Sequence, residues 1–209
     1  MNLIKKIRWW LFAFLAIGVG LYPSLYLFIK RTFGLLGSKS PELLESTLWN
    51  TMFYAHIFLG GLALLVGWIQ FSESIRRKRI NFHRNIGKLY VISVIISGVA
   101  SLYIGYFATG GLVTSLGFIS LGVLWLYTTI GAYIAIKNRQ LKRHQELMIY
   151  SYAACFAAVT LRIWLPLLTA LFDGAFLPAY KIVAWLCWVP NIIVAYFIVR
   201  KTPSPAAAL

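Results

Sequence analysis

Acidic side chains are scarce in this sequence, which has 5 Asp and Glu residues against 20 Lys and Arg. Charged residues of both signs make up only 12% of the chain, whereas hydrophobic residues make up 60% and the mean hydropathy is +0.77. Soluble domains carry about 25% charged residues. The balance excludes an ordinary soluble fold and predicts an integral membrane protein.

Cysteine and histidine are also rare. The two cysteines, Cys155 and Cys187, each lie inside an apolar run and are predicted to be small buried side chains, without a disulfide framework or zinc-type spacing. Three histidines are too few for two bis-histidine haems. No hydrolase triad, phosphate-binding glycine loop or metalloprotease helix is recognisable, so the sequence identifies no catalytic residue, leaves open whether the protein is an enzyme, and predicts no metal site.

Long apolar runs dominate the rest of the chain. A helix that crosses a bilayer needs about 20 predominantly apolar residues, because its backbone polar groups must be satisfied internally. Six segments qualify, at Trp9 to Ile29, Trp49 to Phe71, Leu89 to Ala108, Leu112 to Ile136, Leu147 to Leu171 and Ile182 to Val199. We predict an all-α polytopic membrane helix bundle, a single bundle over residues 1–201, and a disordered tail over 202–209.

Two connections carry local signals. Only Thr109, Gly110 and Gly111 separate the third and fourth spans, and glycine permits the positive φ that a tight helical turn requires. Before the second span, Ser40 is a predicted N-cap, followed by a proline and Glu42 in the first helical turn. A helix is therefore predicted to begin ahead of the second apolar run.

The basic residues are distributed unequally between the two sides of the predicted membrane. One side collects 15 of the 20 Lys and Arg residues and the other side 4, with Arg162 inside the fifth span. Because basic loops are retained in the cytoplasm, both termini are predicted to be cytoplasmic. The clusters lie between apolar runs, which excludes nucleic acid and predicts anionic lipid as the partner of the loops Arg76 to Lys88 and Lys137 to Arg143.

Two polar residues are predicted deep within the outer half of the membrane. His56 lies roughly 10 Å and Arg162 roughly 13 Å below the outer ends of their spans, at 1.5 Å per residue. Intramembrane ionisable residues are functional candidates, so the two are predicted to form a polar site for an anion or proton. A structural alternative is that His56 bonds a neighbouring helix and Arg162 binds carbonyls exposed by Pro166 or Pro190.

The other two histidines, His83 and His144, end the two basic loops and are predicted to lie near the cytoplasmic boundary, about 22 Å from the level of His56. They are candidate axial ligands of one b-type haem, or quinone contacts. The alternative is that they are ordinary interfacial histidines. Asn191, next to Pro190, is predicted to satisfy a freed backbone group or to bind a polar ligand.

Several short motifs extend this pattern over the second to sixth spans. They are His56-Ile57-Phe58-Leu59-Gly60-Gly61 with Gly67 and Gln70-Phe71, His83-Arg84 with Gly87 and Tyr90, Ala157-Ala158-Val159-Thr160-Leu161-Arg162, and Trp185-Leu186-Cys187-Trp188-Val189-Pro190-Asn191. With these motifs the chain resembles the bacterial family of predicted membrane proteins called DUF2306. The fifth span departs from the family pattern His-Arg-x-Trp-Met, because it reads His144-Gln145-Glu146-Leu147-Met148.

The resemblance implies a multi-pass protein of the bacterial cytoplasmic (inner) membrane and supplies no chemistry. Three functions remain open. The favoured one is a non-catalytic assembly, lipid-binding or accessory role. The others are a small transporter using Arg162 and His56, and a redox protein that binds one b-type haem or quinone through His83 and His144.

Overall fold

The computed structural model describes residues 3–28 and 34–202. Within these ranges it contains helices and no strand. Six helical segments are long and apolar enough to cross a membrane, namely Leu3–Leu27, Thr47–Phe71, Ile80–Tyr106, Leu112–Lys137, Leu141–Leu171 and Phe176–Lys201. The predicted all-α class and the six spans are thus confirmed. Residues 29–31 of the first predicted span and loop, and 203–209 of the predicted tail, lie outside the described residues.

The six spans are built from longer and shorter helices in chain order. The first half contains α1 (Leu3–Leu21), η1 (Tyr22–Leu27), η2 (Gly34–Ser38), α2 (Pro41–Glu45), α3 (Thr47–Gly67), η3 (Trp68–Phe71), α4 (Glu73–Lys78) and α5 (Ile80–Tyr106). The second half contains α6 (Leu112–Lys137), α7 (Leu141–Cys155), α8 (Ala157–Leu171), α9 (Phe176–Leu186) and α10 (Val189–Lys201). Several helices extend beyond the apolar runs, because helical hydrogen bonding continues through the adjoining basic residues.

The chain divides into two compact units, Met1–Ser97 and Gly98–Leu209, with the boundary inside α5. Each unit is described by itself. The predicted single bundle stays a prediction.

In the first unit, α1 packs against α3 at a contact between glycines. A Cβ added to Gly61 would lie 2.6 Å from the carbonyl oxygen of Gly20, and one added to Gly20 would lie 3.0 Å from the carbonyl oxygen of Gly61. Neither position therefore accommodates a side chain without movement of the helices. Small residues permit close helix approach in membranes, where apolar burial does not by itself drive association.

The start of α3 differs in one respect from the sequence prediction. Ser40 does cap a helix, since its side chain accepts from the N–H of Leu43 at 3.3 Å. That helix is the five-residue α2, and it ends at Glu45. A second cap, Ser46, then accepts from the N–H of Trp49 at 3.3 Å and begins α3. Two successive serine caps thus replace the single long helix.

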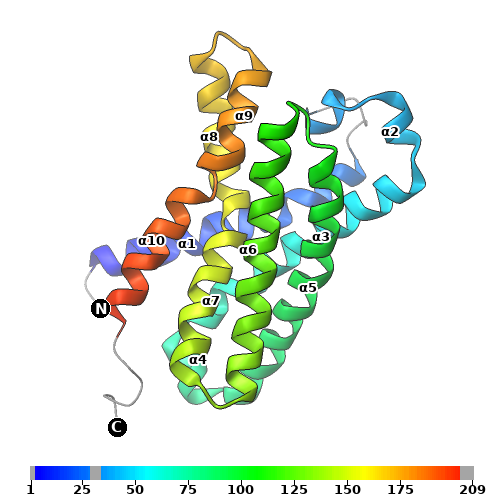
Figure 1. Cartoon of the computed structure of the whole chain (residues 1–209). Helices are drawn as coiled ribbons and strands as arrows, with labels where there is room; N and C mark the ends of the chain where they lie inside the picture. Colours follow the sequence, from blue (N-terminus) through cyan, green and yellow to red (C-terminus); the bar gives the residue numbers. More distant parts are fainter. Residues whose placement is uncertain (1–2, 29–33, 203–209) are drawn as a thin grey trace. The chain divides into compact units, whose positions relative to one another are not determined.

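In the second unit, α6 and α7 form an antiparallel hairpin and lie side by side (Figure 1). The first part of α6 also contacts α9, where a Cβ added to Gly117 would lie 2.9 Å from the carbonyl oxygen of Ala184. The predicted glycine turn before α6 is confirmed, because Gly110 and Gly111 have φ values of 106° and 77°. Close glycine contacts and this turn fix the packing around α6.

The last two spans are interrupted. The fifth breaks at Phe156, between α7 and α8, and the sixth breaks at Cys187 and Trp188, between α9 and α10. The predicted segments Leu147 to Leu171 and Ile182 to Val199 contain these breaks. A broken helix exposes backbone groups that need other partners within a membrane.

Candidate functional site

The four residues predicted from the sequence to form sites are distributed over the two units. His56 and His83 belong to the first unit, and His144 and Arg162 belong to the second. Each predicted pair, His56 with Arg162 and His83 with His144, therefore combines one residue of the first unit with one residue of the second. Both pairings stay predictions, and the surroundings of each residue are described within its own unit.

His56 on α3 is bonded to Ser97 on α5. The Ser97 hydroxyl donates to the His56 carbonyl oxygen at 2.9 Å, and it has a single proton to give. His56 Nδ1 lies 3.1 Å from both the carbonyl and the hydroxyl oxygen of Ser97, so Nδ1 must be the donor in that contact. In a neutral ring the lone pair is consequently on Nε2. This geometry matches the structural alternative of a histidine bonded to a neighbouring helix.

His83 at the start of α5 differs from His56, because its Nδ1 accepts a hydrogen bond instead of donating one. The Gln70 amide lies 3.2 Å from both the His83 carbonyl oxygen and the Gly87 N–H. Because a carbonyl accepts and an N–H donates, the amide nitrogen faces His83 and the amide oxygen faces Gly87. That nitrogen also donates to His83 Nδ1. When the ring is neutral, its proton is therefore on Nε2.

His144 near the start of α7 is oriented by the preceding helix. Its Nδ1 lies 2.9 Å from the carbonyl oxygen of Ala132 on α6. A carbonyl only accepts, so Nδ1 carries the proton and Nε2 the lone pair. Histidines that ligate a metal through Nε2 commonly donate Nδ1–H to a carbonyl in this way. His144 has that geometry, whereas His83 would need its ring proton moved and the Gln70 amide turned.

Arg162 is half-buried on α8, and its Nη1 donates to the carbonyl oxygen of Ala158 at 2.8 Å. Ala158 lies one turn earlier on the same helix. This contact is with a carbonyl, as the structural alternative expects, but with neither of the carbonyls that Pro166 and Pro190 leave without a helical donor.

Asn191 on α10 joins the two interrupted spans. Its Nδ2 lies 3.0 Å from the Cys187 carbonyl oxygen, 3.3 Å from the Ala153 carbonyl oxygen and 3.1 Å from Thr160 Oγ1. The Thr160 hydroxyl also donates to the Cys187 carbonyl oxygen. These contacts are with two carbonyl oxygens and a hydroxyl, as a backbone role expects, but the carbonyl that Pro190 leaves without a helical donor, that of Leu186, is not among them.

The densest charge in the first unit surrounds α4 and the start of α5. We use the term basic corner for Arg76, Arg77, Lys78, Arg79, Arg84 and Lys88. All of them are exposed except Arg76, which is half-buried. Arg77 pairs with Glu73 at 2.7 Å, but both side chains are largely exposed, so the pair contributes at most about 1 kcal/mol. The corner remains strongly positive.

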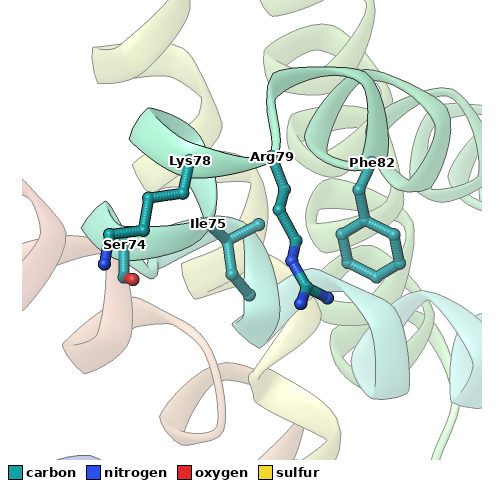
Figure 2. A pocket seen from close by; sticks show the side chains of 5 residues that line it. All are labelled: Ser74, Ile75, Lys78, Arg79 and Phe82. Carbon is teal, nitrogen blue, oxygen red and sulfur yellow. The ribbon is translucent and has the colours of Figure 1, made fainter.

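A hollow adjoins the basic corner. It is lined by Ser74, Ile75, Lys78, Arg79 and Phe82, from α4, the residue that follows it, and the first turn of α5. Figure 2 shows the Arg79 side chain between those of Ile75 and Phe82, and the Lys78 side chain extending along α4. Two cations and a hydroxyl thus share one hollow with two apolar side chains.

Sequence reasoning singled out the cations of this site but missed the other residues. Ile75 and Phe82 are apolar residues isolated within a basic loop, and that contrast is the one sequence signal for a packed surface there. Gln70 belongs to a quoted motif, yet its contact with His83 and Gly87 depends on how η3 meets α5.

Comparison with known proteins supplies a family and no function. No curated protein and no solved structure matches the chain. A family model described as "Predicted membrane protein (DUF2306)" matches residues 53–199. This range covers α3 from Phe53 through most of α10, and it includes all four predicted site residues. The chain belongs to the DUF2306 family of predicted membrane proteins.

Proposed function

We propose that this protein is a non-catalytic, lipid-binding accessory protein of the bacterial cytoplasmic membrane, which holds anionic lipid at its basic corner. One observation carries the proposal, namely the exposure of five cations around α4 and the start of α5 beside an apolar hollow. The proposal assigns this surface to the cytoplasmic side, in keeping with the unequal distribution of basic residues.

The expected free energy of attraction between the basic corner and anionic headgroups is sufficient for retention of anionic lipid. Each Lys or Arg near an anionic membrane surface contributes about 1 kcal/mol, and every 1.4 kcal/mol changes affinity about tenfold. Several exposed cations together therefore favour anionic over zwitterionic lipid substantially. Exposed charges are screened by salt over about 8–10 Å, so the preference should weaken as ionic strength rises.

The second basic loop is a weaker candidate for the same role. It contains Lys137, Arg139, Lys142 and Arg143, all exposed. Lys142 lies 3.9 Å from Glu146, which offsets part of its charge. Since this loop has fewer cations than the basic corner, we propose that it assists binding.

The test compares lipids that differ only in the headgroup. Delipidated protein in zwitterionic detergent is titrated with phosphatidylglycerol and with phosphatidylcholine of the same acyl chains, and bound lipid is counted by native mass spectrometry. We expect a preference of at least about tenfold for phosphatidylglycerol that declines with added salt. Equal binding of the two lipids would contradict the proposal.

A matched pair of variants assigns the preference to a surface. The corner variant changes Lys78, Arg79, Arg84 and Lys88 to Gln, and its control changes Lys137, Arg139, Lys142 and Arg143 to Gln. Both lose four positive charges. We expect the corner variant to lose most of the preference and the control to lose less of it.

A further inference from the structure

We propose that the hollow beside α4 is a discrete binding site for the phosphate and glycerol portion of one phospholipid molecule. This inference rests on the proposed function and adds the number of lipids, the residues that bind, and the residues that shape the site. Its occupant is an amphiphile with an anionic phosphate, because the lining joins cations to apolar side chains.

The polar lining matches a phosphate group. The Arg79 guanidinium offers parallel N–H donors whose spacing fits two phosphate oxygens. Lys78 adds a compact positive charge, and Ser74 adds a hydroxyl donor. A phosphate held by these three side chains has its negative charge opposed by two cations.

The apolar lining distinguishes a lipid from a free anion. Ile75 and Phe82 contribute to the same hollow as the cations. Inorganic phosphate gains nothing from contact with such side chains, whereas the glycerol and first acyl carbons of a lipid bury apolar surface against them. Charge complementarity and apolar contact therefore favour the same occupant.

The hollow extends over two helices, and Arg79 connects them. The N–H of Arg79 donates to the Ile75 carbonyl oxygen at 2.8 Å and ends α4. The carbonyl oxygen of Arg79 accepts from the N–H of His83 at 3.0 Å in the first turn of α5. The main chain of Arg79 is thus held on both sides at the junction, from which its side chain reaches the hollow.

Arg76 and Gln70 add a second connection among the same elements, although neither lines the hollow. Arg76 Nη1 on α4 donates to the Gln70 carbonyl oxygen in η3 at 3.4 Å. Gln70 is 7% exposed, and its side chain contacts His83 and Gly87 on α5. We assign Arg76 and Gln70 as positioning residues, which hold α4 and α5 at the separation that forms the hollow.

Removal of the binding cations is the first test. Lys78→Gln with Arg79→Gln removes two charges from the hollow, and Arg84→Gln with Lys88→Gln removes two charges from elsewhere in the basic corner. Titration of the delipidated protein with phosphatidylglycerol should give one saturable lipid per chain. We expect the affinity for that lipid to fall at least about tenfold in the first variant and about threefold or less in the second. Equal losses, or binding without saturation, would overturn the discrete site.

A second test isolates the positioning residues. Arg76→Gln and Arg77→Gln each remove one charge from α4, but only Arg76 donates to Gln70. We expect Arg76→Gln to lower the affinity for the single lipid more than Arg77→Gln does. Arg76→Lys keeps a donor and the charge, so this variant should retain most of the wild-type affinity. Equal effects of the two glutamine substitutions would reject the positioning role.

Inorganic phosphate serves as the competing occupant. We expect phosphate to displace the lipid no better than sulfate does at equal ionic strength, because neither anion contacts the apolar lining. Selective displacement by phosphate would identify a free phosphate site and overturn the lipid assignment. If wild-type protein shows no preference for anionic lipid, the proposed function itself fails. If the preference is present without a single saturable lipid, only this further inference fails.

Discussion

The side-chain amide of Gln70 in η3 accepts a hydrogen bond from the main-chain N–H of Gly87 in α5 at 3.2 Å, and its nitrogen faces His83. Gln70 is buried, and a glutamine in that position is costly unless both ends of its amide are satisfied. The amide thus acts as a polar connection between η3 and α5, which are separated in sequence by α4.

Replacement of Gln70 by Leu should destabilise the protein by about 1–3 kcal/mol, the usual cost of lost buried hydrogen bonds. The measurement is the apparent melting temperature in detergent. Gln140→Leu is the matched control, because Gln140 is exposed. Equal melting temperatures for the two variants would contradict a structural role for the Gln70 amide.

Lys39, between η2 and α2, should show unusual acid–base behaviour. Burial lowers the pKa of its amine from 10.5 to about 8. The folded protein therefore loses this proton near pH 8, whereas the unfolded chain holds it until about pH 10.5. Because the unfolded state binds more protons between these values, the contribution of Lys39 to stability rises with pH through that window.

Residue-resolved acetylation checks this behaviour. The reaction rate of Lys39 should level off just above pH 8, where its amine is already neutral, while exposed lysines such as Lys78 continue to gain reactivity. Lys39→Met should remove the rise in stability between pH 8 and pH 10.5. If Lys39 and the exposed lysines follow the same pH profile, the amine is not desolvated.

The haem hypothesis has a spectroscopic test. Because the Gln70 amide donates to Nδ1 of His83, this ring could ligate iron only through a lone pair on Nε2, yet Nε2 carries the ring proton. We therefore expect oxidised and dithionite-reduced spectra of the purified protein to contain no Soret band that depends on His83. A stoichiometric Soret band and iron content in the wild type, lost in both His83→Ala and His144→Ala, would support the haem hypothesis against this expectation.

The transporter hypothesis is tested at Arg162. Arg162→Lys keeps a charge and a donor for the Ala158 carbonyl oxygen but loses the planar donor pair that recognises oxyanions. If an anion binds Arg162, its affinity should fall about tenfold in this variant, while the melting temperature without anion changes little. His56→Gln is the companion variant for the predicted polar site. Identical anion-induced thermal shifts in the wild type and both variants would leave Arg162 a purely structural role.

The sequence was sufficient to predict the membrane spans, because a run of about 20 apolar residues has few other stable conformations. It was not sufficient to predict the breaks at Phe156 and at Cys187. Hydropathy counts apolar residues without regard to backbone hydrogen bonding, so the break at Phe156 leaves no hydropathy signal, and Pro190 indicates only that the helix is disturbed near Cys187. Their stability depends on side chains from elsewhere in the fold.

The candidate site was predictable only in part, for a similar reason. The cations of the basic corner are visible as a cluster in the sequence, whereas the hollow requires Phe82 on α5 to approach Ile75 on α4. The ring nitrogens that carry the protons of His56 and His83 could not be predicted from the sequence either. They follow from whether the neighbour of Nδ1 accepts, as Ser97 does, or donates, as Gln70 does.

Asn191 provides the clearest test of the two breaks, because all three of its described contacts place the amide nitrogen against oxygen acceptors. Asn191→Ala leaves these acceptors with fewer donors and should lower stability by about 1–3 kcal/mol. Asn191→Asp should lower it further, because it places a carboxylate oxygen against the carbonyl oxygens of Cys187 and Ala153. The pair Asn138→Ala and Asn138→Asp, at an exposed position, controls for the chemical change alone.

The order of the effects is more informative than their size. Asp and Asn have nearly the same shape. If Asn191 merely fills space, Asn191→Asp should therefore destabilise the protein less than Asn191→Ala. If the amide is the donor that joins the breaks, Ala should be milder than Asp. Apparent melting temperatures of the four variants in one detergent decide between these orders, and a stability loss for Asn191→Asp no larger than that for Asn138→Asp would show that the breaks are held by other contacts.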